Sequence, residues 1–501
     1  MGKPKQKSPK EQNKAAPRNV GSKNNLSFDL LYQLSYMSVI AAGGVPRSQI
    51  FERAAQLPCY TAEYFRKVEL ACRRLKFDYA QACRYIGDAA QEEEIKGLLL
   101  RFSSSLLSGE PEAEFLAREA KAVAENYENE YGRKLEALKM WTDAYVSLIL
   151  SAVLVIIIGV VSTMIWKIQT TFIMGMAFIS ILTTVLGVWL IYLMTPREIV
   201  VLRWPGSREQ KLARRLFALL VPTALAVCAV LLLIKVSPGF VFLVAAALVF
   251  PVGVITAVDA RRVAKRDMEV GVFLRSLGGV CAALGTTVGA ALGRVDLDAI
   301  HTLKAAVKRL HLRLGVGIRT RLCWKKFIDE TGSELANRSV GMFYDAIDLG
   351  GSAGQAGYQA SLFASHIALM RDRRKTVSEP FCWLCIAMHS SVVVLLVFIT
   401  EVIMGFAGMV SKAEAAMPRV PGAPGAGAFT TFNVTGLEYM HSLVLPLVLV
   451  YTIANAIAPT VADGGSRYRF LFNLGLTAVI SGLSLIFLPK MAALLFSQVQ
   501  M

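Results

Sequence analysis

Long apolar segments without a charged side chain constrain this sequence more than any other feature. Residues 146–165 contain no Asp, Glu, Lys or Arg. At about 1.5 Å per residue, a helix of about 20 residues crosses a hydrocarbon layer of about 30 Å. Similar segments recur along the chain and predict about seven transmembrane helices. The other six are 171–194, 216–234, 239–258, 381–400 (extending to 410), 441–461 and 470–489.

The composition agrees with a membrane protein and narrows its partners. Of 501 residues, 54% are hydrophobic, and the formal net charge is +17. A mean hydropathy of +0.48 excludes an ordinary soluble protein of this size. The basic excess favours anionic membrane lipids or an acidic protein partner. Nucleic acid is not expected as a partner, because the chain lacks a basic motif with interleaved aromatic residues.

Two longer stretches between the apolar segments carry amphipathic helices. In the first, Phe65, Val68 and Cys72 follow one another at steps of three and four, which places them on one helix face. We therefore predict helical bundles at 26–145 and 259–380. Each runs straight into an apolar segment, and no helix breaker separates the first module from its span, so a continuous helix should enter the membrane.

These patterns divide the whole chain. The predicted parts are a disordered basic tail (1–25), a first helical module (26–145), a transmembrane hairpin (146–194), a basic loop (195–215), a second hairpin (216–258), a second helical module (259–380), a transmembrane helix (381–410), a loop rich in Gly, Pro and Ala (411–440) and a last hairpin (441–496). The expected fold class is all-α.

The distribution of Lys and Arg predicts the orientation. The tail, both modules and the 195–215 loop hold most of the basic residues, so the positive-inside rule places them and the N-terminus in the cytoplasm. A multi-pass protein of the cytoplasmic membrane is expected. The 411–440 loop would then lie outside, where Asn433 begins an N-glycosylation pattern.

Residues 270–293 allow an alternative topology. They contain a single charge, Arg275, and glycines spaced by four at 285, 289 and 293, which also suits a membrane helix. A crossing there would move the basic residues of 304–326 outside. We therefore expect 270–293 to remain in the cytoplasmic module.

Motifs that would carry chemistry are weak. The chain lacks the phosphate-binding loop of an ATPase. A glycine-rich segment begins at Gly350, but no strand precedes it, and a helix stop like that at Gly109 explains it better. Cys382 and Cys385 begin an apolar helix and are expected to pack as small apolar side chains rather than bind a metal. We predict no catalytic, cofactor-binding or metal-binding residue and no enzyme activity.

A few polar side chains lie inside the apolar segments. They are His389, Glu401, Asn455 and Asn473. Ionisable groups in a membrane are functional candidates by default. An ion-coupled transporter usually carries more of them near the midplane, so a secondary transporter is the alternative rather than the first choice.

The two modules match in order and spacing, which indicates a duplication. Leu31 and Leu34 of the first correspond to Leu274 and Leu277 of the second. In each module a Phe is followed seven residues later by a Gly, and then by the helix that enters the membrane. These pairs are Phe102 with Gly109, and Phe343 with Gly350.

This duplicated layout resembles the inner-membrane platform proteins of type II secretion and type IV pili. The extra hairpins make it more similar to the archaeal branch, which serves archaella and adhesive pili. The resemblance implies a homodimeric, non-enzymatic platform under a growing filament. It would bind a hexameric secretion ATPase in the cytoplasm and couple it to extraction of pilin-like subunits from the membrane.

Under this interpretation the basic residues of the second module are the candidates for ATPase docking. They are Lys304, Lys308, Arg309, Arg313, Lys325, Lys326, Arg371, Arg373 and Arg374. Archaellum, adhesive pilus and secretion remain open as the process served. A membrane scaffold for signalling is a third hypothesis, although the sequence lacks a kinase or similar output motif.

Overall fold

The computed structural model describes residues 25–165, 170–202, 206–416 and 434–499. In those ranges every named element is a helix, and Val201 and Ser333 form an isolated β-bridge. Seven of the helices are long and apolar enough to cross a membrane, and each overlaps one of the seven predicted spans. The predicted all-α, polytopic class is therefore confirmed. The basic tail and Asn433 lie outside the described residues.

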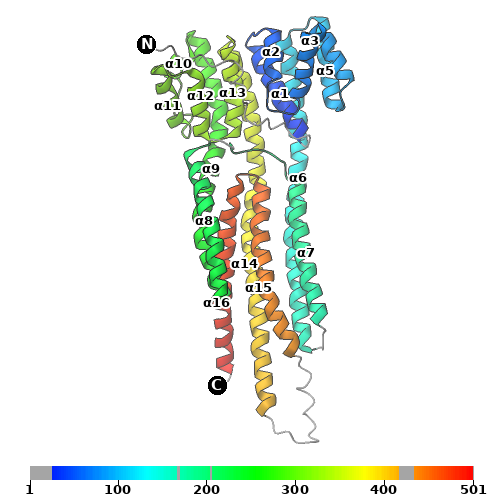
Figure 1. Cartoon of the computed structure of the whole chain (residues 1–501), viewed down its shortest axis with the longest axis vertical. Helices are drawn as coiled ribbons and strands as arrows, with labels where there is room; N and C mark the ends of the chain where they lie inside the picture. The colour runs from blue at the N-terminus through cyan, green and yellow to red at the C-terminus, as the bar shows by residue number, and fades with distance from the viewer. Residues whose placement is uncertain (1–24, 166–169, 203–205, 417–433, 500–501) are drawn as a thin grey trace, which may run out of the picture. The chain divides into compact units, whose positions relative to one another are not determined.

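The chain forms two compact units, which are described separately. Unit 1 comprises residues up to 130, 266–328 and 335–368, and unit 2 comprises 131–265, 329–334 and 369–501. Three continuous helices contribute to both units, as Figure 1 shows. They are α6 (Glu112–Ile165), α9 (Pro238–Leu284) and α14 (Ala353–Ala416). The continuous helices expected after each module are thus present.

The first-module helices of unit 1 enclose an aromatic core. Phe51 lies 4.6 Å from Tyr79 and 5.3 Å from Phe102 between ring centroids, and Phe102 stacks on Phe115 at 4.9 Å. These rings are brought together by amphipathic helices that each bury one face. The helices are α1 (Leu26–Ala42), α2 (Arg47–Ala54), α3 (Ala62–Leu75), α4 (Tyr79–Asp88) and α5 (Glu93–Ser108), followed by the start of α6.

The second-module helices of unit 1 have an aromatic core of their own. Phe273 of α9 lies 5.5 Å from Phe327, and Trp324 contacts both Phe327 and Phe343. All four side chains are buried. After α9 the elements are α10 (Val288–Ala291), α11 (Lys304–Gly315), α12 (Thr320–Thr331), α13 (Glu334–Asp348) and the start of α14.

The matched Phe and Gly residues occupy equivalent places in the two modules. Phe102 and Phe343 are both fully buried. Gly109 follows α5 with φ +74°, and Gly350 follows α13 with φ +84°. A positive φ ends a helix readily at Gly because Gly has no Cβ. Both glycines therefore stop a helix one turn before the long helix begins.

The two modules pack against each other inside unit 1. The Gly43 carbonyl accepts a hydrogen bond from the Ser352 amide at 3.0 Å, at the turn between α13 and α14. The Tyr36 hydroxyl of α1 donates to Asp345 of α13 at 2.8 Å. The Arg338 guanidinium lies over the rings of both Phe28 and Tyr32. Unit 1 is thus one compact body that contains helices of both predicted modules.

Residues 270–293 do not form one helix. Helix α9 ends at Leu284, and Gly285 follows with φ +57°. The part before that turn buries Phe273 and Leu277 in unit 1. The small-residue spacing that suggested a separate membrane helix is therefore divided by a turn.

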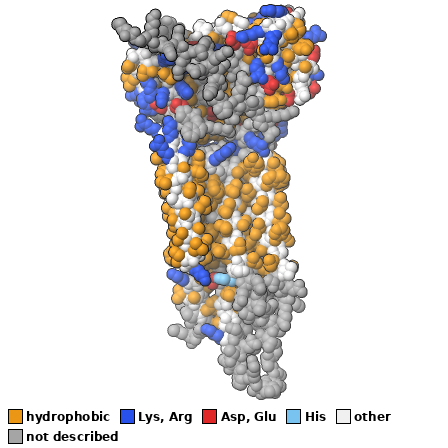
Figure 2. Space-filling model, viewed as in Figure 1, with side chains coloured by type: hydrophobic (Ala, Val, Ile, Leu, Met, Phe, Trp, Pro, Cys, Tyr) orange, Lys and Arg blue, Asp and Glu red, His pale blue; other side chains and the backbone are white. Residues whose placement is uncertain are grey.

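Unit 2 is a bundle of long apolar helices. Apolar side chains cover these helices on the face seen in Figure 2, and the exposed ones on α8 include Leu219, Leu225 and Leu233. Exposed apolar surface of this extent is typical of contact with lipid. Its own helices are α7 (Thr170–Met194), α8 (Arg208–Leu233), α15 (Val434–Asp463), the 3-10 turn η2 (Arg467–Arg469) and α16 (Phe470–Val499).

Small residues allow α9 and α16 to approach closely. A Cβ on Gly253 would lie 2.4 Å from the Phe472 amide nitrogen, and one on Gly239 would lie 2.9 Å from the Gly482 carbonyl oxygen. Backbone contact through glycine is a common way for membrane helices to associate, since lipid provides no hydrophobic force between them. These contacts hold the α8–α9 hairpin against α16.

Candidate docking surface and intramembrane polar cluster

The segment from Lys304 to Lys326 is strongly basic. It contains eight Lys and Arg residues and no Asp or Glu. It forms α11, a short turn and α12 in unit 1 (Figure 1). We call this segment the basic hairpin.

The basic side chains of the basic hairpin lie on the helix faces that point away from the core. Helix α11 buries Ala306, Val307 and Leu310, and α12 buries Cys323, Trp324 and Phe327. The basic residues between these positions must then face away from the core. Lys308, Arg309, Lys325 and Lys326 are exposed, Lys304 is partly exposed, and Arg313 is half-buried.

One ion pair is visible at the start of the basic hairpin. The Lys304 ammonium lies 2.8 Å from the Asp298 carboxylate, and both side chains are solvent-accessible. The hydrogen bond and charge of Lys304 hold the pKa of Asp298 below its ordinary value. An exposed pair of this kind contributes little to stability. Lys304 therefore remains able to exchange Asp298 for an acidic group on a partner.

The basic hairpin also exposes apolar side chains, which its pattern of charges does not indicate. Leu312 of α11 is 64% exposed, and Val316 of the turn is 80% exposed. Ile318 of the turn and Leu322 of α12 are also exposed. The turn passes through Gly317 at φ +78°. A cluster of exposed apolar groups among charged ones is typical of a protein-binding site. In the sequence, Leu312 is the residue that indicates this exposed apolar surface. It does not lie on the helix face formed by Leu303, Val307 and Leu310.

The arginines of 371–374 lie in unit 2, whereas the basic hairpin lies in unit 1. Arg371 pairs with Glu198 at 3.0 Å, and both side chains are largely buried. Arg374 is only 3% exposed. Its guanidinium donates to the carbonyl oxygens of Pro196, Val461 and Ala462 at 2.9–3.1 Å.

This burial corrects the assignment of Arg374 to partner docking. Its charge satisfies the last carbonyls of α15, which a helix end otherwise leaves without partners. Arg373 is exposed on the same helix and stays in the candidate set. The sequence alone does not distinguish the two arginines, because it does not show which distant segments pack against each side chain.

A buried polar cluster connects four helices of unit 2. Its members are Tyr145 of α6, His389 of α14, Thr452 and Asn455 of α15, and Thr477 and Ser481 of α16. All of them are buried within apolar spans.

The hydrogen bonds of the cluster assign a role to each group. The Tyr145 hydroxyl donates to Asn455 Oδ1 at 2.9 Å, and Asn455 Nδ2 donates to His389 Nδ1 at 3.2 Å. His389 Nε2 lies 3.2 Å from the Thr477 carbonyl oxygen, which can only accept. The proton of the neutral imidazole therefore sits on Nε2. This chain of hydrogen bonds ties the four helices together.

The other polar groups of the spans also have partners. Asn473 Nδ2 donates to the Thr460 hydroxyl at 3.0 Å, and Cys382 Sγ lies 3.7 Å from Asn473 Oδ1. Glu401 lies 3.9 Å from His441. The eight cysteines are all free thiols. Among the described residues, groups of three or more His, Cys, Asp or Glu that could hold a metal ion do not occur.

The fold and these sites define a polytopic α-helical membrane protein with an exposed basic hairpin. The chain is a homologue of archaeal proteins named Flagella accessory protein J, consistent with the archaellum and type IV pilus platform family that its sequence resembles.

Two such relatives define the extent of the similarity. The protein of Methanococcus voltae is 24% identical over 334 residues, which cover 64% of this chain and 59% of the relative. The protein of Methanocaldococcus jannaschii is 23% identical over 419 residues, which cover 79% of this chain and 71% of the relative. The match to the first relative thus spans less than two thirds of its length. No family model and no solved structure matches the chain.

Proposed function

We propose that the chain is the membrane platform for assembly of an archaellum or a related type IV pilus-like filament. The observation that carries this proposal is the similarity to Flagella accessory protein J, which extends over 79% of the chain in one relative. The matched length of 419 residues is greater than the length of either module or of the transmembrane spans alone. The all-α architecture with two related modules supports it further.

The proposal includes a location and an orientation. The platform lies in the cytoplasmic membrane with its N-terminus, both modules and the 195–215 loop in the cytoplasm. The support is the concentration of Lys and Arg in those segments, which the positive-inside rule associates with the cytoplasmic face.

The basic hairpin is the proposed docking surface for a cytoplasmic secretion ATPase. Its eight positive charges would attract an acidic surface over long distances and accelerate encounter. The exposed Leu312, Val316 and Leu322 would then supply the apolar centre that charges alone lack. Arg373 extends the candidate set, whereas Arg374 is removed by its burial.

Continuous helices provide a route for mechanical coupling. Helices α6 and α14 each run without interruption from residues of unit 1 into apolar spans of unit 2. A rigid helix transmits a displacement along its axis better than a flexible loop. We propose that ATPase motion reaches the membrane along these helices and drives extraction of pilin-like subunits, with the platform acting as a homodimer and catalysing no reaction itself.

A secondary transporter is the alternative function. The buried His389 favours it, because ionisable groups within spans often belong to a transport pathway. Both ring nitrogens of His389 have hydrogen-bond partners, which fits a structural role better. Substrate-dependent flux in proteoliposomes containing the purified chain would support the transporter and count against the platform.

Charge reversal tests the docking surface. The triple variant Lys304→Glu, Lys308→Glu and Arg309→Glu should lose most of the ATPase recovered after crosslinking in native membranes and purification through an N-terminal tag. The measurement is mass spectrometry of the recovered partners. Arg74→Glu, at an exposed basic position of α3, is the matched control and should retain the ATPase.

Two other results would change the interpretation. Full ATPase recovery by the triple variant, with normal membrane insertion, would exclude these residues from the interface. Recovery of neither an ATPase nor pilin-like subunits by the unmodified chain, at good yield, would contradict the platform itself.

A further inference from the structure

The end of the α8–α9 hairpin at which α8 begins is strongly basic. Residues 208–265 contain eight Lys and Arg but only two acids, Glu209 and Asp259. Seven of the basic residues belong to this end, and Lys235 lies at the other. Five of the seven are exposed and form no ion pair among the described residues. We call these five the basic collar: Arg208, Lys211, Arg215, Arg261 and Lys265.

One ion pair aligns the two helices at this end of the hairpin. The Arg262 guanidinium of α9 lies 2.6 Å from the Glu209 carboxylate of α8. Arg261 and Arg208 are the chain neighbours of that pair, so they lie at about the same height. Arg215 lies about 10 Å further along α8, at 1.5 Å per residue. The basic collar is therefore a band around this end of the hairpin.

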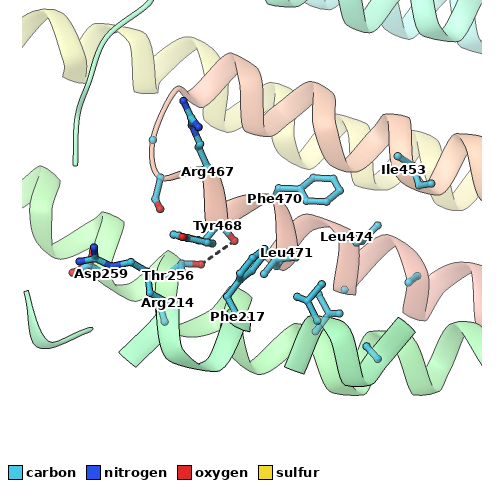
Figure 3. A pocket seen from close by; sticks show the side chains of 18 of the residues that line it. Arg214, Phe217, Thr256, Asp259, Ile453, Arg467, Tyr468, Phe470, Leu471 and Leu474 are labelled. Carbon is cyan, nitrogen blue, oxygen red and sulfur yellow. Dashed lines mark hydrogen bonds between the residues drawn. The ribbon is translucent and has the colours of Figure 1, made fainter. Parts of the chain in front are cut away.

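The inner side of the hairpin packs on the rest of unit 2. Phe217 of α8 lies 5.0 Å from Tyr468 between ring centroids, and the Thr256 hydroxyl of α9 donates to the Tyr468 carbonyl oxygen at 3.2 Å (Figure 3). Phe217 also packs against the buried cluster that contains Leu471 of α16. These contacts use positions of α8 and α9 that are not in the basic collar. The collar is thus left on the outer surface of the hairpin.

The same outer surface continues as an exposed apolar surface toward the middle of the spans. Leu219 follows Arg215 by one helical turn and is exposed, and Val258 precedes Arg261 by one turn and is also exposed. Figure 2 shows Lys and Arg side chains at the end of the apolar surface. Exposed apolar residues within a span contact lipid chains. The basic collar therefore lies where lipid headgroups begin.

The two acids of the hairpin do not neutralise the basic collar. Glu209 is already paired with Arg262. Asp259 is 2% exposed, and its oxygens accept hydrogen bonds from Ser207 and Gln210 at 3.0 Å. The exposed charge that remains has one sign and attracts anions.

Helix α6 has mixed charges at the corresponding place before its span. Arg133, Lys134 and Lys139 are exposed there, but so are Glu136 and Asp143. The positive-inside rule is met by both arrangements, because it counts Lys and Arg and gives little weight to acids. Orientation in the membrane therefore does not explain why the acids are missing from the outer surface of the α8–α9 hairpin.

We propose that the basic collar binds the headgroups of anionic membrane lipids and concentrates these lipids around the α8–α9 hairpin. Guanidinium and ammonium groups donate to the phosphate oxygens, and the hydrocarbon chains lie along Leu219 and Val258. Clusters of Lys and Arg at the end of a membrane helix are typical sites for such lipids. An acidic protein segment would match the charge, but only a lipid also matches the apolar surface that continues from it.

The test measures which lipid contacts position 219. A chain without its eight native cysteines carries Leu219→Cys labelled with bimane and is placed in phosphatidylcholine vesicles. Quenching by nitroxide-labelled phosphatidylglycerol is compared with quenching by nitroxide-labelled phosphatidylcholine at the same fraction. We expect about fivefold preference for phosphatidylglycerol, which is the effect of about one Lys or Arg at an anionic surface. Added salt should reduce this preference.

A second reporter position tests whether the preference is local. Leu148→Cys places bimane on an exposed position of α6, after the mixed charges. The two lipids should quench it nearly equally. A similar preference for phosphatidylglycerol at positions 148 and 219 would overturn the proposed concentration of lipid at the hairpin.

Two matched sets of substitutions identify the charges responsible. Arg208→Gln, Lys211→Gln and Arg215→Gln together should lower the preference at position 219 to that at position 148. Arg133→Gln, Lys134→Gln and Lys139→Gln remove the same charge from α6 and should leave position 219 unchanged. Quenching by phosphatidylcholine shows in each case that position 219 is still in contact with the bilayer.

Other results would overturn the lipid site. Equal quenching by both lipids at position 219 would show that the basic collar does not select anionic headgroups. Retained preference after the three collar substitutions would assign it to other charges. A photocrosslinker at position 212, next to Lys211, that captures mainly protein in native membranes would show a protein occupant. None of these results depends on ATPase recovery, so the lipid site and the proposed function fail separately.

Discussion

At the scale of single residues, burial decides what a charge does. Arg373 and Arg374 are neighbours on α14, yet Arg373 is exposed and Arg374 is enclosed by three carbonyl oxygens. A buried guanidinium is stable only when such partners compensate for the water it has lost. The same residue type therefore serves as a surface charge in one position and as a helix cap in the next.

Arg374→Ala should destabilise unit 2 strongly. The change leaves the carbonyls of Pro196, Val461 and Ala462 without their donor, which we expect to cost about 3 kcal/mol. Unfolding by dodecyl sulfate in mixed micelles, followed by circular dichroism, measures the free energy. Arg215→Ala, at an exposed position, should change it by less than about 0.5 kcal/mol. Equal effects of the two changes would refute the cap.

Asp345 makes the stability of unit 1 depend on pH. Burial raises the pKa of this carboxyl above its ordinary value of 3.8, more than the hydrogen bond from Tyr36 lowers it. An acid with a raised pKa in the folded state stabilises the fold below its ordinary pKa. That contribution is lost as the pH rises through the raised pKa.

Asp345→Asn should therefore be more stable than the unmodified chain at pH 8, with the difference closing toward pH 4. Asn keeps an oxygen that can accept from the Tyr36 hydroxyl. Unfolding free energies measured at intervals between pH 4 and 8 give the comparison. Asp348→Asn, at an exposed neighbouring position, removes one surface carboxylate and serves as the control for that change of charge. A constant difference for Asp345→Asn at every pH would contradict the argument.

At the scale of helices, glycine permits close packing at some positions and only weakens the helix at others. Gly278 and Gly279 are adjacent in α9. A Cβ on Gly278 would lie 2.6 Å from the Ala353 carbonyl oxygen of α14, whereas a Cβ on Gly279 would meet nothing within 4 Å. Close contact between α9 and α14 thus depends on one of the two.

Alanine at these two positions should act in opposite directions. Gly278→Ala should destabilise unit 1 by about 1–3 kcal/mol, because backbone atoms must move to accept the methyl group. Gly279→Ala should stabilise it by about 0.5–1 kcal/mol through the lower chain entropy of Ala in the unfolded state. Chemical unfolding of the two variants side by side measures both signs. Two changes of the same sign would show that the observed helix contact does not control stability.

At the scale of the whole molecule, charge distribution predicts which loops face the cytoplasm. The loop between α8 and α9 has one basic residue, Lys235, whereas the segments before α6 and between α9 and α14 have many. The proposed orientation places that loop outside and the first module inside.

Labelling of single cysteines should show this orientation. In a chain without its eight native cysteines, Ser237→Cys should react with a membrane-impermeant maleimide in intact cells. Ser108→Cys, exposed at the end of α5, should react only after the membrane is permeabilised. The reverse pattern would invert the proposed topology and move the basic hairpin away from any cytoplasmic ATPase.

The sequence by itself determined the fold class, the seven spans and the glycine stops, because each depends on a local property. Apolar length defines a membrane helix, and Gly109 and Gly350 need only their own freedom of φ. Only the tertiary structure decided which polar groups are enclosed. Arg374, His389 and Gly278 acquire their roles from partners on helices distant in the sequence, and a pattern along one helix carries no information about what packs against it.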